Sequence, residues 1–257
     1  MSSDHQDHVA REIELHEALA RVYTEQRYRP AFSRLFQKHW NRRMTALAGL
    51  AHGAVVVDYG CGTGILLPDL VEAGLRPIAL DVSADMLLAA PRLPGSLMLR
   101  ADGCRMPVMD ASVDAVLCRG SIHHLPDLEG AFTEIARVLK RGGTLVFSEP
   151  SNDSPVNRAA RYVMYRRSAE FNVDDEGLRR KEILPMLARQ GFVVEHSRGF
   201  GFLAYTIAGF PDKLNVLARV PGATLLTRVL IAVDSLLERL PLIHAFALHW
   251  QVRARKR

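Results

Sequence analysis

The stretch VVVDYGCGTG, residues 55–64, decides how the rest of the chain is interpreted. Its three consecutive valines are β-branched, which favours a strand buried on both faces, as in a parallel sheet. Gly60, Gly62 and Gly64 follow at every second position, where glycine permits positive φ and close backbone approach without a steric penalty. The next segment, ILLPDLVEAG (65–74), has the apolar spacing of a short helix that ends at its glycine. The sequence therefore predicts a strand, a glycine turn and a helix N-terminus with a ligand above them.

The spacing of these glycines bears on which ligand binds. A dinucleotide fingerprint reads G-x-G-x-x-G/A, and its third small residue lets the helix pack closely on the strand. Counted from Gly60, that position holds Ile65, which is large and branched. The pattern here is G-x-G-x-G after an acidic residue, so a nicotinamide cofactor is disfavoured. On the glycines alone, a tight turn without any ligand stays open as the alternative.

Length and composition are those of an ordinary globular protein. The 257 residues are 48% hydrophobic and 24% charged, which is enough for one sizeable core with an appended lid. The polar N-terminal stretch predicts no signal peptide, and no run approaches the roughly 20 apolar residues that span a bilayer. Cys61, Cys104 and Cys118 suit a reducing compartment, so we expect a cytoplasmic protein. Cys61, set between glycines, is interpreted as a small residue in a tight site rather than a nucleophile.

The net charge of +5 is unevenly distributed along the chain. Residues 51–150 carry more acidic than basic side chains, whereas the excess of Lys and Arg lies mainly in residues 151–257. This distribution predicts an anionic substrate or surface near the parts appended to the glycine-turn segment. The terminal RARKR (253–257) is interpreted as a solvated tail.

From residue 53 onward the sequence alternates between strand and helix patterns. This alternation predicts an α/β fold with a doubly wound, mostly parallel sheet. The expected strands are 54–57, 77–80, 97–99, 115–117, 144–148, 192–197 and, at an edge of the sheet, a last strand within 244–254. The expected helices are 9–26, 31–50, 65–74, the one ending in the glycines of DLEGAFTEIARVLKRGG, 154–167 and 176–190.

A long insert before the last strand carries a further helix with an apolar stripe. The stripe comprises Leu225, Leu226, Val229, Leu230, Val233, Leu236, Leu237 and Leu240. A lid helix that packs on the domain through this stripe is favoured over a helix that lies on a membrane surface.

Acidic and polar residues follow four of the expected strands, where open α/β sheets bind their ligands. They are Asp58 with the glycine turn, Asp81, Asp102 with Gly103 and Cys104, and the segment CRGSIHHLPD (118–127). One acidic residue after a strand is common, because turns collect Asp, but three in register beside a glycine turn predict a ligand site. Asp81 is suited to accept hydrogen bonds from a ribose diol, and Asp102 from an adenine amino group.

Together these motifs resemble class I S-adenosylmethionine-dependent methyltransferases, in particular small-molecule enzymes (methyltransferase domain type 11) that methylate ubiquinone and menaquinone precursors. The similarity covers roughly residues 53–150, in VVVDYGCGTG, ALDVSADML, ADGCRMPV, DAVLCRGSIHHLPD and EIARVLKRGGTLVFSEP. It implies a seven-stranded Rossmann-like sheet in one domain overall. Residues 1–50 would be an N-terminal helical cover, 51–150 the cofactor-binding core, and 151–257 the rest of the sheet with a substrate lid.

The resemblance also implies the cofactor, S-adenosyl-L-methionine, and its product, S-adenosyl-L-homocysteine. The glycine turn would hold the methionine part, Asp81 the ribose, and Asp102 and Gly103 would border the adenine. The candidate cofactor-binding residues are Asp58, Gly60, Cys61, Gly62, Gly64, Asp81, Val82, Met86, Asp102, Gly103, Arg119 and Gly120. This cofactor has no pyrophosphate, which agrees with the missing third glycine. Its carboxylate suits helix-end amides, and its ammonium and diol suit acidic side chains. No metal ion is expected.

Three residues are candidates for moving a proton. The sulfonium already activates the methyl group, so the protein mainly needs in-line positioning and removal of a proton. In related enzymes the loop holding IHHLPD and the end of the fifth strand line the active site, which implies His123, His124 and Glu149. A histidine suits this role near neutral pH, but the alternative that both histidines only shape the cofactor site stays open. Further candidates for closing over the ligands are Tyr23, Tyr28, Tyr162 and Tyr165.

The methyl acceptor is expected to be a small molecule. The apolar insert and the cationic flanks favour a lipid-like, quinone-like or polyketide-like acceptor, methylated on oxygen or carbon. A nucleic-acid methyltransferase is an alternative, disfavoured because GSIHHLPD stands where base-amine methyltransferases carry Asn/Asp-Pro-Pro-aromatic. A non-catalytic binding protein with this fold is another. We expect no nucleic-acid partner and at most weak peripheral membrane contact, and the sequence leaves the oligomeric state open.

Overall fold

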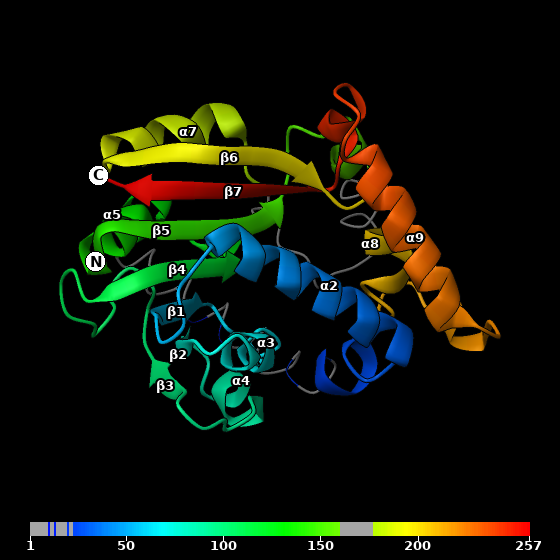
Figure 1. Cartoon of the computed structure of the whole chain (residues 1–257), viewed down its shortest axis with the longest axis horizontal. Coiled ribbons are helices and arrows are strands. Elements are labelled where there is room, and N and C mark those ends of the chain that lie inside the picture. Colours follow the sequence, from blue (N-terminus) through cyan, green and yellow to red (C-terminus); the bar gives the residue numbers. More distant parts are fainter. Residues whose placement is uncertain (1–9, 11–12, 14–19, 21–22, 160–176) are drawn as a thin grey trace.

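A computed structural model of the chain describes residues 10, 13, 20, 23–159 and 177–257. Figure 1 shows a central twisted sheet with helices on both faces. The sheet has seven strands in the order β3-β2-β1-β4-β5-β7-β6, which confirms the expected doubly wound α/β fold. The strands are β1 (Val55–Tyr59), β2 (Arg76–Asp81), β3 (Leu97–Arg100), β4 (Val113–Arg119), β5 (Leu139–Pro150), β6 (Phe192–Phe200) and β7 (His249–Lys256).

The first five strands are parallel, and their register puts the ends of neighbouring strands at one edge of the sheet. Tyr59 of β1 pairs with Leu80 of β2 and with Cys118 of β4. The residues that follow these strands therefore meet above a single edge. This register brings the predicted site residues together.

The last strand is not at an edge, so that expectation is wrong. β7 lies between β5 and β6 and is antiparallel to both, which leaves β6 as the edge strand. Trp250, Val252 and Ala254 point to one face of the sheet and are completely buried in the core that it forms with α5 and α7. An alternating sequence such as HWQVRARK predicts a strand, but it does not predict which strands pair with it in the sheet.

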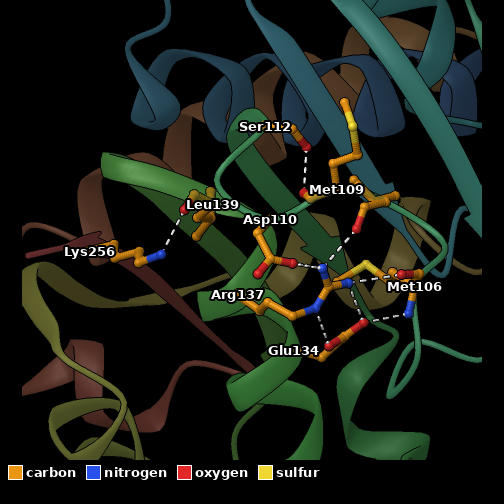
Figure 2. A network of polar contacts seen from close by, with 9 residues as sticks. Met106, Met109, Asp110, Ser112, Glu134, Arg137, Leu139 and Lys256 are labelled. Atoms are coloured by element: carbon orange, nitrogen blue, oxygen red, sulfur yellow. Dashed lines mark hydrogen bonds and ion pairs between the residues drawn. The ribbon is translucent and has the colours of Figure 1, made fainter.

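The basic C-terminal residues are not a solvated tail either. Arg253 and Arg255 of β7 lie 3.1 and 2.6 Å from the carboxylate of Glu195 on β6. Lys256 donates to the backbone carbonyl of Leu139 at 2.7 Å, a bond that Figure 2 shows. The RARKR segment therefore belongs to the sheet.

Helices cover both faces of the sheet. They are α2 (Ala31–Ala48), α3 (Leu67–Glu72), α4 (Ala84–Ala89), α5 (Leu128–Val138), α7 (Arg180–Arg189), α8 (Leu203–Ala208) and α9 (Ala223–Leu237). Side chains of α5 and α7, such as Phe132 and Leu187, form one core with the sheet. Side chains of α2, α3 and α8, such as Phe36, Leu70 and Ala204, form the other. Short helical turns are η1 (Tyr23–Arg27), η2 (Ile122–His124), η3 (Leu217–Arg219) and η4 (Ile243–Phe246).

Several helix boundaries differ from those expected. α3 begins at Leu67 rather than at residue 65, because the glycine turn continues to Ile65 and Leu66 before regular helix starts. α7 begins at Arg180 rather than residue 176, and residue 176 lies outside the described part of the chain. Most of the helix expected at 9–26 and the second half of the helix expected at 154–167 also lie outside it.

The helix of the insert exists as α9, but of its apolar stripe Leu230 packs against the core and most of the rest does not. Thr227, Asp234 and Glu238 face the protein and are buried. Most of the apolar stripe faces outward, and Leu225 and Leu236 are 68% and 60% exposed. Hydrogen bonds decide the orientation, because Asp234 accepts three backbone N–H groups of the 202–204 segment at 2.9–3.1 Å. The prediction that the helix packs on the domain as a lid through its apolar stripe is therefore wrong.

An arginine on α5 fixes the loop between β3 and β4 (Figure 2). Arg137 donates to the backbone carbonyls of Val108 and Met106 at 2.8 and 2.9 Å, and to the carboxylate of Glu134 at 2.7 and 2.8 Å. It also contacts Asp110, and Glu134 accepts the N–H of Met106 at 2.6 Å. Charge-assisted bonds of this kind hold the loop that begins at residue 101, and with it one part of the predicted site.

Candidate active site

The glycine turn has the backbone that the sequence predicts. Gly60, Gly62 and Gly64 have φ values of 64°, 52° and 74°, a region that side chains with a Cβ rarely adopt. A Cβ on Gly60 would stand 2.5 Å from Cβ of Ser121, so the turn after β4 lies directly against the glycine turn. The Ser121 hydroxyl donates to the carbonyl of Tyr59 at 2.7 Å and holds the two turns together.

Two groups of opposite charge lie near the ends of β1 and β4, beside these turns: Asp58 is buried and Arg119 is half-buried. Asp58 is 2% exposed, and its Oδ2 atom has no hydrogen-bond partner among the described residues. Burial raises the pKa of Asp58 to about 7; the nearby Arg119 lowers it in part, and Asp81 raises it further. Arg119 contacts the side-chain oxygen of Gln37 and stacks 4.0 Å above the ring of Trp40. Its Nε is buried and has no partner in the described part of the chain, and burial lowers its pKa.

Asp81 follows β2 and binds the glycine turn. Its Oδ2 accepts the N–H of Gly62 at 2.8 Å, and its Oδ1 accepts the N–H of Ser83 at 2.9 Å. Each carboxylate oxygen keeps a lone pair for another donor. Met86 is buried below, and its sulfur would lie 4.0 Å from a Cβ placed on Gly62.

The remaining predicted cofactor residues lie around these two strands. Val82 is half-buried directly after Asp81, and its carbonyl accepts from Arg100 at 3.2 Å. Gly120 has φ 65°, and no described atom lies within 4 Å of a Cβ built on it. Cys61 is buried, and desolvation raises the pKa of its thiol well above the ordinary value. A thiol that stays protonated is a poor nucleophile, which agrees with its interpretation as a small filling residue.

Asp102 and Gly103 lie beyond β3. Asp102 accepts the N–H of Cys104 at 2.8 Å, which closes the loop on itself. A Cβ on Gly103 would stand 1.9 Å from the hydroxyl oxygen of Tyr59, so the glycine is needed to admit that ring. The Tyr59 hydroxyl is buried without a partner in the described part of the chain, and burial raises its pKa.

The predicted proton-moving residues also come together. His123 Nδ1 lies 2.6 Å from Glu149 Oε2, and the ring centroids of His123 and His124 are 4.0 Å apart. Glu149 is completely buried, and its Oε1 accepts the N–H groups of Ser121 and Ile122 at 3.0 and 3.2 Å. A carboxylate that accepts from Nδ1–H leaves His123 Nε2 as the proton acceptor. Glu149 therefore orients the ring.

Sequence reasoning missed an aromatic cluster on the other side of Arg119. Trp40 contacts Tyr205 and His249, with ring centroids 5.5 and 4.9 Å away, and the Tyr205 hydroxyl and His249 Nε2 share a hydrogen bond of 2.5 Å. Trp40 also donates to the hydroxyl of Ser148 at 2.9 Å. These residues come from α2, α8, β5 and β7, and each pattern alone indicated only a core position.

Two of the four tyrosines proposed to close over the ligands lie in the described part of the chain. Tyr23 packs edge-on against Tyr28 at 6.2 Å and lies under the guanidinium of Arg27, which pairs with Asp212 at 2.5 Å. Tyr28 and Tyr205 both lie near Arg119. Tyr162 and Tyr165 lie outside the described residues.

Comparison with known proteins agrees with this arrangement. Residues 57–147 match the family described as "Methyltransferase domain". A demethylmenaquinone methyltransferase of Mycobacterium sp. (strain JLS) is 30% identical over 188 residues, which is 72% of this chain and 74% of that protein. The chain belongs to the class I S-adenosylmethionine-dependent methyltransferases.

Solved structures support the methyltransferase fold. A chain solved with the Trm112 methyltransferase activator of Haloferax volcanii has a TM-score of 0.62 at 20% identity, covering 96% of each chain. Phosphoethanolamine N-methyltransferase 2 of Haemonchus contortus, solved with S-adenosylhomocysteine, has a TM-score of 0.57 at 17% identity over 88% of this chain and 57% of that one. At these identities the likeness concerns the fold alone.

The buried charges of this methyltransferase fit the amino-acid end of its cofactor. A carboxylate and a guanidinium, each with an unsatisfied atom, match an ammonium and a carboxylate at the two ends of one zwitterion. Asp58 and Arg119 are thus the two groups with a reason to bind such a ligand. Each is costly to bury without one.

The raised pKa of Asp58 makes the stability of the free methyltransferase depend on pH. Its folded-state value of about 7 lies above the ordinary 3.8, so the folded state holds a proton that the unfolded state releases between these values. The contribution of Asp58 to stability is full below about pH 4 and is lost as pH rises through about 7, by up to about 4 kcal/mol. Asp58→Asn removes this dependence.

Urea denaturation over this pH range measures the effect. The free energy of unfolding of Asp58→Asn relative to that of wild type should rise steadily from acidic to neutral pH. A difference between the two proteins that stays constant with pH would contradict the shift.

Proposed function

We propose that this methyltransferase transfers a methyl group to a small apolar acceptor of quinone-like chemistry, on carbon or oxygen. Its relatives named demethylmenaquinone methyltransferase support the acceptor class. The observation that carries the proposal is the contact between His123, on the turn that lies against the glycine turn, and Glu149 at the end of β5. A nucleic-acid substrate has no comparable support.

The cofactor is proposed to bind with its amino-acid end between Asp58 and Arg119. Its ammonium would neutralise the carboxylate of Asp58, and its carboxylate would accept from the buried Nε of Arg119. Asp81 would accept from the ribose hydroxyls while holding the N–H of Gly62. Asp102 and Gly103 would border the adenine.

The proposed chemistry needs one base. When bound, the cofactor supplies a methyl group that its sulfonium already activates for in-line transfer. In transfer to oxygen, His123 Nε2 would accept the acceptor's hydroxyl proton as the methyl group leaves the sulfonium. In transfer to a ring carbon, it would accept the same hydroxyl proton, and the hydrogen on the methylated carbon would then move to the ring oxygen as the ring becomes aromatic again, so one proton is released overall. Glu149 stabilises the resulting imidazolium through Nδ1–H.

The aromatic cluster supports an apolar, flat acceptor. Trp40, Tyr205 and His249 lie beside Arg119, at the end of the sheet where the cofactor's reactive part is expected. Aromatic rings of this kind favour stacking with an acceptor ring. Weak peripheral contact with a membrane belongs to the same proposal, because apolar acceptors of this class partition into bilayers.

Asp81 is tested by calorimetry with S-adenosylhomocysteine. Asp81→Ala removes charged acceptors worth about 1.5–3 kcal/mol each, so the Kd should rise at least tenfold. Asp85→Ala, an exposed change on the helix that follows, should leave the Kd unchanged. Equal affinities in the two variants would remove Asp81 from the ribose role.

His123 is tested by the rate of methylation of a short-chain naphthoquinol. His123→Ala should lower kcat by roughly 100-fold or more with little change in cofactor affinity, because a positioned base contributes that much. Glu149→Gln should lower kcat and shift its pH profile, and the surface variant His52→Ala should behave as wild type. If His123→Ala loses cofactor affinity in proportion to rate, the histidine shapes the cofactor site instead.

A further inference from the structure

Exposed apolar side chains are concentrated in one segment of the methyltransferase. Of the seventeen large apolar residues exposed in the described part of the chain, twelve lie between residues 203 and 246. We call the outward side of this segment the α9 face. It comprises Leu203, Leu214, Val216, Val220, Leu225, Leu226, Val229, Val233, Leu236, Leu240, Leu242 and Phe246.

The helix α9 supplies the centre of this face and runs along the outer edge of the molecule (Figure 1). Leu225, Val229 and Leu236 share one side of the helix and are 68%, 52% and 60% exposed. Asp234 and Glu238 anchor the opposite side. These bonds fix the orientation of the helix, because turning its apolar side inward would break them and leave the N–H groups of residues 201–204 without their carboxylate acceptors.

The charged side chains of residues 203–246 also differ between the inner and the outer side of the segment. Its three carboxylates all point inward and are paired: Asp212 with Arg27, Glu238 with Arg43, and Asp234 with backbone N–H groups. Its four cations are all exposed: Lys213, Arg219, Arg228 and Arg239. The α9 face therefore combines aliphatic and cationic side chains, and the segment contributes no carboxylate to it.

We propose that the α9 face docks the methyltransferase on the surface of an anionic lipid bilayer. A helix that presents aliphatic and basic side chains together lies in the interface of such a membrane, with its apolar side among the acyl chains. Basic side chains near the surface add attraction to anionic headgroups. The inference deepens the membrane contact of the proposed function, and vesicle binding is measured without any methyl acceptor, so its failure is distinguishable from a failure of the proposed chemistry.

Two other occupants fit the face less well. In a two-fold dimer the same patch meets itself, which would bring the exposed arginines together with no carboxylate from the segment to offset them. A protein partner is expected to meet aromatic and Met residues at the centre of an interface, whereas Phe246 is the one exposed aromatic side chain on the α9 face. An aliphatic and cationic surface matches lipid better than either.

Docking through this face would also orient the acceptor side of the enzyme. Asp234 of α9 binds the first N–H groups of α8, and α8 carries Tyr205, which contacts Trp40 and His249. The helix on the membrane surface is thus joined directly to the aromatic cluster.

Vesicle co-sedimentation of the full chain tests the proposal. We expect binding to vesicles of phosphatidylcholine with phosphatidylglycerol, weaker binding to phosphatidylcholine alone, and partial reversal at high salt. Arg228→Glu with Arg239→Glu should weaken binding at least tenfold, and Leu225→Ser with Leu236→Ser likewise. Matched surface controls elsewhere are Arg76→Glu and Leu88→Ser, and Leu88 is 72% exposed on α4.

The variants also decide between the outcomes. All four should bind S-adenosylhomocysteine as wild type does, which shows that they are folded. Absence of vesicle binding by the wild type, or equal binding by the α9-face variants and the controls, would overturn the proposal. So would a wild-type dimer in light scattering that the leucine variant dissociates, because the face would then join two copies.

Discussion

The contact between two turns at Gly60 is the constraint on which the active site depends. A Cβ at this position would stand 2.5 Å from Ser121, so only glycine lets the turn after β4 lie against the turn after β1. Ser121 then holds the carbonyl of Tyr59 with its hydroxyl and Glu149 with its N–H. Glu149 in turn orients His123. The glycine turn and the pair of His123 and Glu149 are therefore held relative to one another by one close backbone approach.

This contact also explains why charges can be buried where they are. Asp58 and Arg119 lie near the ends of neighbouring strands, where water is excluded from the Asp58 carboxylate and from Nε of Arg119. In the free protein the raised pKa of Asp58 is the consequence of that exclusion. Unpaired charges destabilise the free protein, and a ligand of complementary charge that pairs with them binds more tightly for that reason.

Much of the sheet, and the grouping of the candidate cofactor residues after its strands, could be predicted from the sequence, because the signals are local. VVVDYGCGTG fixes a strand and its turn within ten residues, and Asp81 and Asp102 follow their strands directly. Parallel pairing then brings them together without further information. His123 and Glu149 were found through the family resemblance, and the structure joins them by a hydrogen bond.

The features that were predicted wrongly or missed depend on contacts between distant residues. The orientation of α9 follows from Asp234, which binds N–H groups about thirty residues away, and a helical stripe alone cannot reveal that. The position of β7 depends on which strands pair with it, and alternation leaves this open. Trp40, Tyr205 and His249 meet only in the folded protein.

The most direct test of the account is a crystal structure with S-adenosylhomocysteine bound. The account predicts the amine nitrogen within hydrogen-bond distance of Asp58 Oδ2 and the carboxylate of the ligand within reach of Arg119 Nε. A bound ligand whose amine and carboxylate both contact other groups, with Asp58 and Arg119 still unsatisfied, would contradict it.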